Sequence, residues 1–372
     1  MATFGTIGEF VEGDEDWTEY EESLTLELRL DMELRLVMEL RLDMELRLGC
    51  VDYSLNLEQC FFSSTLSLFV PLRPSIMTQV PAPHLAILER SKNVKDEDKM
   101  YRFEGRLYPS IVSPAENLEA LRTMEARADD VMLVAYPKCG FNWMVAVLRK
   151  IIAASSGVKE SSEMAPLIEF CTPERQKAIA EQPSPRLLGT HLYPEIIPAS
   201  FKDMKTKMLV VWRNPKDTLV SYFHFMNKNP VLPSVEWDQF FSDFMSGEVG
   251  WGSYFDHALA WNKLMDDPNV KTVTFEELKQ DLSEGIRQIS QFFGFPLTEE
   301  QVQTIYSETT FSAMSTNSVH GKMGSVFFRK GEVGDWRNHF SEAQSQQMDE
   351  EFNKRLAGTK LGALLQYDTY CK

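Results

Sequence analysis

Residues 136–143 read YPKCGFNW and are the most informative stretch of the chain. The apolar run Val131–Ala135 before it predicts a buried strand, and Met144–Arg149 after it predicts the start of a helix. The N–H groups of such a loop and the positive end of the helix dipole point at one place, where Lys138 adds a full charge. The stretch therefore predicts a cradle for a phosphate-bearing ligand.

Strands and helices alternate along the chain beyond this loop. Further apolar runs predict strands at Leu187–His191, Met208–Trp212 and Val270–Glu276. Helices are predicted near 282–293, 299–307 and 342–356, and residues 318–335 are predicted to form a long loop. Such alternation is typical of an α/β fold, here a single domain with a central parallel sheet flanked by helices.

The segment after Met208–Trp212 carries the signals of a helix start. Asn214 can cap a helix, Pro215 suits its first position, and Asp217 completes a capping-box-like arrangement. The helix is expected to continue through Phe225.

Three polar residues follow directly on predicted strands. Lys138, His191 and Arg213 each lie just past the end of one. Ligands of open parallel sheets bind beyond the carboxyl ends of the strands. The three side chains are therefore expected on one rim of the sheet.

The charge of the chain limits its partners. The formal net charge of the 372 residues is −17, and residues 1–76 alone hold 16 acidic and five basic side chains. Nucleic acid and anionic membranes usually require a broad basic surface, so neither is expected as a partner. Any site for an anion must then be a local cluster of basic residues.

Cysteine usage and the apolar segments favour a cytoplasmic protein. The five cysteines are scattered, without CxxC spacing, which indicates a reducing compartment rather than a disulfide framework or a zinc site. No signal peptide is expected, because no positive region precedes an apolar core at the N-terminus. The apolar patch 61–72 is too short to cross a bilayer, which takes roughly 20 residues.

Residues 1–76 are predicted to be a low-complexity extension, and residues 77–372 the functional domain. A hexad beginning Leu28-Arg29-Leu30 recurs to Leu48, with Leu or Met at every even position. Strict alternation favours a strand, whereas Leu, Met, Glu and Arg favour a helix, and such conflict argues against one well-specified element. An oligomerisation segment is the alternative, and Met77 is a possible natural start.

Each candidate residue also has an ordinary structural explanation when it is taken alone. The glycine-rich GxxxxGK[ST] pattern is absent, so Lys138 with Gly140 could form a plain turn. His191 alone would more often be structural, and the Arg329-Lys330 pair could belong to a solvated loop. The aromatic residues that draw attention, namely Trp143, Phe275 and Phe311, could belong to the core.

Taken together and in this order, the motifs resemble the cytosolic sulfotransferases that use 3′-phosphoadenosine 5′-phosphosulfate (PAPS). The resemblance runs from about residue 100 to Lys372, and it is greatest to the 6B type, which has Cys after the loop lysine. It is carried by four spaced segments, Tyr136–Trp143, Ser184–Leu192, Arg213–Ser221 and Arg329–Trp336.

The resemblance implies a P-loop-like sulfotransferase fold and a PAPS site without a metal. The 5′-phosphosulfate would be held by Lys138, Cys139, Gly140, Phe141, Asn142 and Trp143. The 3′-phosphate would be held by Arg213, Ser221, Arg329 and Lys330, with Gly331 in the same motif. The adenine would be enclosed by Trp143, Phe275 and Phe311, with Thr309 and Thr310 near its polar edge.

The resemblance also implies the catalytic roles. His191 would take the proton of the acceptor, because its ordinary pKa suits a base near neutral pH. Lys138 would offset the charge that grows on the leaving phosphate oxygen. The acceptor is expected to be a small apolar or aromatic hydroxyl or amine compound, in a pocket that includes Phe103 and Phe225.

Several positions depart from the family pattern. Phe141 and Asn142 stand where two threonines are usual, and Gly189 replaces a lysine common two residues before the histidine. The C-terminal dimer motif is altered at Arg337, Ser341-Glu342 and Gln346, so a homodimer is not predicted.

Two other functions stay open at this point. A catalytically weak or inactive protein that binds PAPS or its product PAP is the first alternative, because of Phe141 and Gly189. A nucleotide-dependent kinase is the second, although no Asp-based magnesium site is evident in the sequence.

Overall fold

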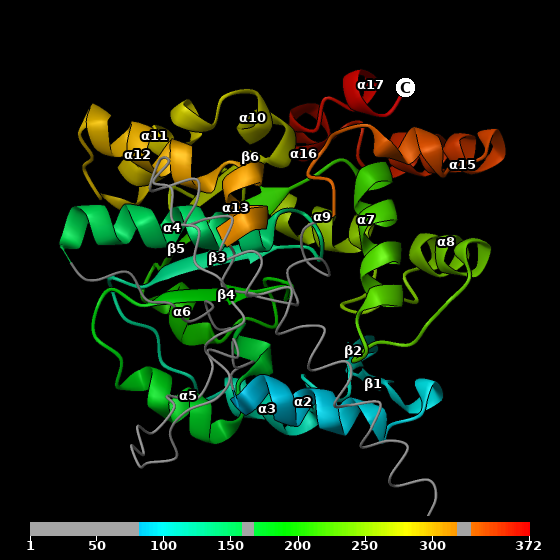
Figure 1. Cartoon of the computed structure of the whole chain (residues 1–372), viewed down its shortest axis with the longest axis horizontal. Coiled ribbons are helices and arrows are strands. Elements are labelled where there is room, and N and C mark those ends of the chain that lie inside the picture. The colour runs from blue at the N-terminus through cyan, green and yellow to red at the C-terminus, as the bar shows by residue number, and fades with distance from the viewer. Residues whose placement is uncertain (1–81, 158–166, 318–328) are drawn as a thin grey trace, which may run out of the picture. The chain divides into compact units, whose positions relative to one another are not determined.

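The computed structural model describes residues 82–157, 167–317 and 329–372. At its centre is a parallel sheet with the strand order β4-β3-β5-β6. Its strands, in chain order, are β3 (Val131–Ala135), β4 (Leu187–Thr190), β5 (Lys207–Trp212) and β6 (Val270–Thr274). Parallel strands with helices between them confirm the predicted α/β fold (Figure 1).

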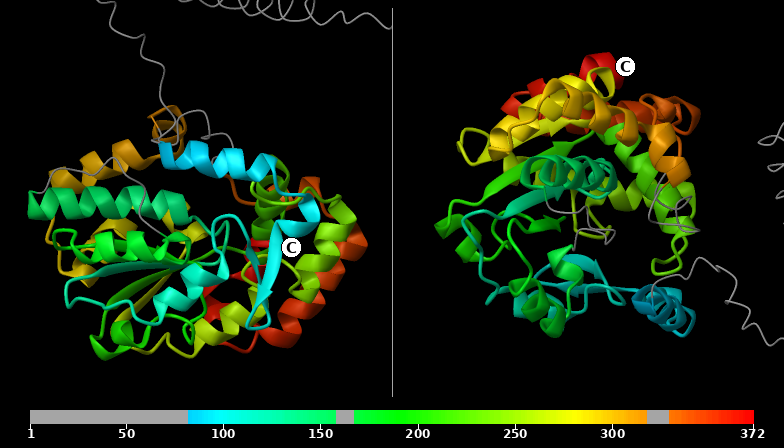
Figure 2. Two further views of the ribbon diagram at one scale, coloured as in Figure 1. Left: turned by 90° about the horizontal axis from the view of Figure 1, so that it is seen from below. Right: turned by 60° about the vertical axis from the view of Figure 1, so that its left-hand side comes forward.

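Helices fill the crossovers and the C-terminal region. The helices include α3 (Ala115–Leu121), α4 (Phe141–Ser156), α5 (Pro173–Ala180), α7 (Pro215–Lys228), α8 (Trp237–Ser246), α9 (Tyr254–Asn262), α11 (Leu282–Phe293), α12 (Glu299–Thr309) and α15 (Glu342–Arg355). The others are α2 (Ala82–Lys92), α6 (Ala199–Asp203), α10 (Phe275–Gln280), α13 (Phe311–Asn317), α16 (Lys360–Leu364) and α17 (Tyr367–Tyr370). In Figures 1 and 2, α3 and α5 lie toward the β4 edge of the sheet, and α10–α12 lie toward the β6 edge.

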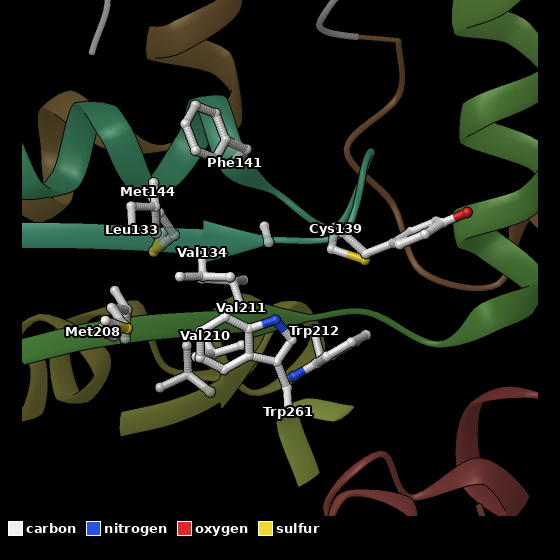
Figure 3. Packing of buried hydrophobic residues seen from close by; sticks show 14 of the residues in the cluster. Leu133, Val134, Cys139, Phe141, Met144, Met208, Val210, Val211, Trp212 and Trp261 are labelled. Atoms are coloured by element: carbon white, nitrogen blue, oxygen red, sulfur yellow. The ribbon is translucent and has the colours of Figure 1, made fainter. Parts of the chain in front are cut away.

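The central strands are buried on both faces. All five residues of β3 are buried, as expected for a parallel strand covered by helices. Figure 3 shows Met144 of α4 beside Leu133 of β3, and Trp212 of β5 beside Trp261 of α9. This packing holds α4 against β3 and so positions the loop that joins them.

Two predicted boundaries need correction. Helix α4 begins at Phe141 rather than Met144, so Phe141–Trp143 form its first turn instead of the loop. Strand β6 ends at Thr274 rather than Glu276, because Thr274 and Glu277 form a capping box that starts α10. A capping box outweighs the apolar pattern because it satisfies two otherwise unpaired backbone N–H groups.

The start of α7 confirms Asn214 as a cap but not Asp217 as part of a capping box. The Asn214 side chain accepts a hydrogen bond from the Asp217 N–H at 2.8 Å, and Pro215 takes the first helical position. The Asp217 carboxylate accepts a hydrogen bond from the Asn214 side-chain amide at 2.8 Å rather than from the Asn214 backbone N–H. It also accepts from the backbone N–H groups of Gly334 at 2.7 Å and Trp336 at 3.0 Å. Asp217 therefore ties α7 to the segment that follows Arg329.

A short antiparallel hairpin precedes the sheet and was not predicted. It consists of β1 (Met100–Phe103) and β2 (Arg106–Pro109). Leu107 of β2 pairs with Gly250, and the Leu107 carbonyl accepts a hydrogen bond from the Trp251 N–H at 2.8 Å. The hairpin therefore lies against the segment that carries Trp251.

Several expectations concern membranes, metals, cysteines and the N-terminal extension. Within the described ranges, no helix is long and apolar enough to cross a bilayer, and no group of His, Cys, Asp or Glu is placed to hold a metal ion. Cys139, Cys171 and Cys371 are buried free thiols. The predicted extension 1–76 and the loop 318–328 lie outside the described residues, so both stay predictions.

A buried ion pair joins the start of β3 to the start of β4. Arg186 donates to Asp130 through Nε at 2.7 Å and through Nη2 at 2.6 Å, and both side chains are almost fully buried. We expect Asp130→Ala to lower the free energy of unfolding by about 3–5 kcal/mol, because it leaves the Arg186 charge buried and unpaired. Chemical denaturation measures this change.

The exposed pair of Arg102 and Glu248 provides the matched control for this prediction. Glu248→Ala is expected to cost at most about 1 kcal/mol, because solvent screens an exposed pair. A similarly small loss for Asp130→Ala would show that the buried pair does not stabilise the junction of the two strands.

Candidate active site

The ends of β3, β4 and β5 meet at one rim of the sheet. The register pairs Val134 with Thr190 and Ala135 with Val211, so the segments that follow these strands emerge side by side. The His191 ring reaches back to β3, with Nδ1 2.6 Å from the Ala135 carbonyl oxygen. The structure thus brings together the three rim positions that the sequence predicts.

The loop between β3 and α4 has an unusual backbone. Lys138 and Gly140 have φ angles of 71° and 104°, both in the left-handed region. For Lys138 this conformation costs about 1–3 kcal/mol, and such strain is concentrated at functional sites. Gly140 also lacks space for a side chain, because a Cβ atom would lie 3.1 Å from Cδ2 of Phe275.

The first turn of α4 presents its N–H groups to this loop. Gly140 is the N-cap residue, and no described side chain caps the helix. The N–H groups of Phe141, Asn142 and Trp143 belong to the four at a helix start that have no partner within the helix. Together with the helix dipole they form a site for an anion.

Three cationic side chains surround the loop. Burial, together with the nearby charges of Arg213 and Arg329, lowers the pKa of Lys138 to about 7. Arg213 is buried, donates from Nη2 to the Glu332 carbonyl at 2.8 Å, and keeps a buried Nε without a hydrogen-bond partner among the described residues. Clustered cations with an unused buried donor fit an anionic ligand.

Two of the residues predicted to hold a second phosphate, Arg329 and Lys330, pair with Asp335. Its carboxylate lies 2.5 Å from Arg329 Nη2 and 2.6 Å from Lys330 Nζ. Burial opposes ionisation of Asp335, but hydrogen bonds from Lys330, Asn338 and Arg329 hold its pKa below the ordinary value. Ser221 belongs to α7, the helix that Asp217 ties to the same segment.

The predicted aromatic residues form two contacts near the loop. The rings of Trp143 and Phe275 lie 5.2 Å apart at 69°, and the Arg213 guanidinium lies 4.5 Å from the Phe275 centroid. Phe311 packs directly on Gly331, where a Cβ atom would lie 2.1 Å from its Cδ2. These contacts place both aromatic groups beside the cationic residues.

The two threonines are placed differently from each other. Thr309 is fully buried, its hydroxyl donates to the Ile305 carbonyl at 2.7 Å, and its own carbonyl accepts from Trp143 Nε1 at 2.8 Å. The Thr310 hydroxyl accepts from the Ala313 N–H at 3.3 Å. Thr309 therefore orients Trp143 through its backbone, while its side chain is used within α12.

His191 has the geometry of a base. A carbonyl oxygen can only accept, so Nδ1 carries the proton that is donated to Ala135, and Nε2 is left unprotonated. The rings of Phe141 and Trp251 contact the imidazole edge-to-face at 5.0 Å and 5.1 Å. Burial, with a smaller contribution from Lys138, lowers the pKa of His191 to about 4, so the ring is neutral at pH 7.

Comparison with known proteins decides the family. Residues 128–360 match the sequence model of the sulfotransferase domain. The chain belongs to the sulfotransferase family. It is an enzyme of the cytosolic type, and its resemblance to the 6B sulfotransferases is confirmed.

Sulfotransferase 6B1 of Danio rerio is 62% identical to this sulfotransferase over 289 residues, which cover 77% of this chain and 98% of the relative. Sulfotransferase 6B1 of Homo sapiens is 47% identical over 288 residues, with 77% and 95% coverage. Among solved structures, mouse sulfotransferase SULT7A1 complexed with PAP aligns with a TM-score of 0.66 and 31% identity, covering 72% of this chain and 99% of that one.

Glu169 is a residue of this sulfotransferase site that sequence reasoning missed. It is fully buried, and Oε1 accepts hydrogen bonds from the His191 N–H at 2.8 Å and Trp251 Nε1 at 3.2 Å. Oε2 accepts from the Thr190 hydroxyl at 3.0 Å, and burial raises the pKa of Glu169 to about 7. A carboxylate within the apolar run Leu167–Phe170 was the signal that could have found it.

Cys139 is structural in this sulfotransferase rather than reactive. Its thiol is fully buried and lies 3.6 Å from the Thr218 hydroxyl. Burial raises the pKa of the thiol to about 12, so no thiolate forms near neutral pH.

The two predicted pocket residues differ in their relation to the site. The Phe225 ring lies 4.2 Å from Lys138 Nζ and therefore borders the cationic loop. Phe103 lies on β1 and packs edge-on against Tyr108 at 6.5 Å. Its place in an acceptor pocket stays a prediction.

Proposed function

We propose that this sulfotransferase transfers the sulfuryl group of PAPS to a hydroxyl or amine of a small, apolar or aromatic acceptor. The observation that carries the proposal is the unprotonated Nε2 of His191 on the same rim as Lys138. The acceptor oxygen or nitrogen forms a bond to sulfur while the bond from sulfur to the 5′-phosphate oxygen breaks. His191 Nε2 takes the acceptor's proton, and Lys138 offsets the charge that grows on the leaving oxygen.

The donor would lie along the loop and the cationic cluster. The 5′-phosphosulfate binds at Lys138–Trp143, where backbone N–H groups and the helix dipole favour an anion. The 3′-phosphate binds at Arg213, Ser221, Arg329, Lys330 and Gly331. The unpartnered Nε of Arg213 supports this assignment, and so does the mouse sulfotransferase solved with PAP.

The adenine would lie between the two aromatic groups. Trp143 and Phe275 form one contact, and Phe311 on Gly331 forms the other. Stacking of a base on such rings contributes about 1–3 kcal/mol. The chemistry requires no metal ion, because the sulfuryl group is already electrophilic and the cationic side chains stabilise the leaving group.

Incubation with ³⁵S-labelled PAPS and a panel of phenols, alcohols and amines tests the proposal. We expect label in at least one apolar phenol or amine without added metal. Tight binding of PAP with no transfer to any acceptor would instead favour the alternative function, a nucleotide-binding protein without activity.

Binding of PAP is expected to take up a proton at pH 8. The pKa of Lys138 is about 7 in the free protein, so the amine is mostly neutral at pH 8. The phosphates of PAP are fully ionised there, since their second pKa is about 6, and their charge raises the pKa of Lys138 on binding. Affinity for PAP should therefore fall as pH rises above 7.

Calorimetry in two buffers of different ionisation enthalpy measures this proton. Wild-type protein should take up most of one proton at pH 8, and Lys138→Met should take up none. Equal heats in both buffers for the wild type would contradict a neutral Lys138 in the free protein.

A further inference from the structure

Two departures from the family pattern, Phe141 and Gly189, lie in direct contact. A Cβ atom added at Gly189 would lie 2.2 Å from Cζ and 2.7 Å from Cε2 of Phe141, closer than real atoms approach. Gly189 lies in β4 and has no positive φ, so its backbone does not require glycine. A strand interior ordinarily disfavours glycine. The ring of Phe141 therefore explains why position 189 carries no side chain.

The same ring contacts the base. Phe141 is the first residue of α4, is 7% exposed, and meets the His191 imidazole at 5.0 Å and 63°. Trp251 provides a second edge contact at 5.1 Å, and the Ala135 carbonyl holds Nδ1. Two aromatic contacts and one hydrogen bond thus fix the ring whose Nε2 must face the acceptor.

We propose that Phe141 is a positioning residue for His191 and that its ring requires the space left by Gly189. Together, Phe141 and Gly189 make the acceptor side of the His191 ring apolar. This inference rests on the proposed function for the role of His191. A charged side chain at position 189 is sterically excluded while Phe141 is present. The enzyme therefore favours an uncharged acceptor over one that carries a carboxylate near its reacting hydroxyl.

A double-mutant cycle of Phe141→Ala and Gly189→Ala tests the contact without any need for activity. Gly189→Ala alone should lower the melting temperature clearly, because its Cβ clashes with the ring. In the Phe141→Ala background the same change should have almost no effect. If Gly189→Ala alone is insoluble, recovery of soluble protein in the double variant supports the contact, and an insoluble double variant overturns it.

Titration of the His191 ring by NMR tests the positioning role. Without the Phe141 ring the imidazole gains water, so its pKa should rise from about 4 toward its ordinary value of 6.5. Phe241→Ala is the matched control, because Phe241 is another buried ring that packs on Phe340. It should lower the melting temperature but leave the titration of His191 unchanged.

Acceptor preference tests whether Phe141 and Gly189 make the acceptor side of His191 apolar. The exchange Phe141→Thr with Gly189→Lys should lower the ratio of kcat/KM for 4-ethylphenol over 4-hydroxyphenylacetate by about tenfold or more. An unchanged ratio of kcat/KM would overturn the idea that the pair makes the acceptor side of His191 apolar. An unchanged His191 pKa in Phe141→Ala would overturn the positioning role. Equal effects of Gly189→Ala in both backgrounds overturn the contact. If the enzyme transfers no sulfuryl group, the proposed function is wrong. The melting temperatures of the double-mutant cycle and the NMR titration of His191 still test the contact between Phe141 and Gly189.

Discussion

Replacing His191 with alanine is expected to lower kcat by about 10²–10⁴-fold, the usual contribution of a positioned base. The neutral ring, with its proton on Nδ1 and its free Nε2, is the proton acceptor in the proposed transfer. Without it, the acceptor proton must leave to water while the bond to sulfur forms. The affinity for PAP should change little, because His191 belongs to the acceptor side of the rim. Steady-state kinetics and calorimetry with PAP measure the two quantities.

The pH profile adds a second readout for His191. Its pKa of about 4 in the folded protein means that the base is protonated and inactive only at acidic pH. Activity in the wild type should therefore persist well below the ordinary titration range of histidine, provided that the protein stays folded. A His191→Ala enzyme with wild-type kcat and an unaltered acid limb would exclude His191 as the base.

Replacing Lys138 with methionine is expected to lower kcat by about 10²–10³-fold, comparable to the loss of one donor that stabilises a developing anion. The side chain keeps a similar length and apolar stem but loses its charge beside the leaving phosphate. PAP affinity should fall as well, because the bound donor is the anion that keeps Lys138 protonated at neutral pH. The loss in kcat should exceed the loss in PAP affinity if the charge acts mainly in the transition state.

Lys207 offers a matched control for this substitution. It begins β5 and so lies at the amino ends of the strands, opposite the rim that carries Lys138, and its amine lies 5.7 Å from the Phe292 ring. Lys207→Met should leave kcat and PAP affinity nearly unchanged. If Lys138→Met behaves like Lys207→Met, the loop lysine has no part in the reaction, and the backbone N–H groups of α4 must carry the anion alone.

The nature of the anion site also explains the role of Asp335. In the free protein its carboxylate occupies the Arg329 and Lys330 side chains that the 3′-phosphate would need. A phosphate with two charges and more acceptor oxygens competes with this single carboxylate. In the proposed site, Asp335 would therefore keep Arg329 and Lys330 paired until the donor binds.

Local sequence patterns predicted the scaffold well because they report short-range physics. The apolar runs of β3 and β5, the Asn214 cap and the turn at Gly140 each depend on neighbouring residues. The general rule that parallel strands end on one rim then gathered Lys138, His191 and Arg213. Boundaries were less accurate, since the capping box at Thr274 competes with the strand pattern that precedes it.

The α/β fold, the predicted anion-binding loop and the family of this protein could be inferred from its sequence alone, because these are carried by motifs whose residues act over short distances or in a fixed order. The hydrogen bond of Glu169 to His191 and the pairing of Asp335 with Arg329 and Lys330 became visible only in the folded structure. The structure also showed that the Phe141 ring, on helix α4, fills the space that a side chain at Gly189 in strand β4 would need. Such contacts depend on the packing of segments 22 to 48 residues apart or on the electrostatics of a buried site, and no local pattern encodes either.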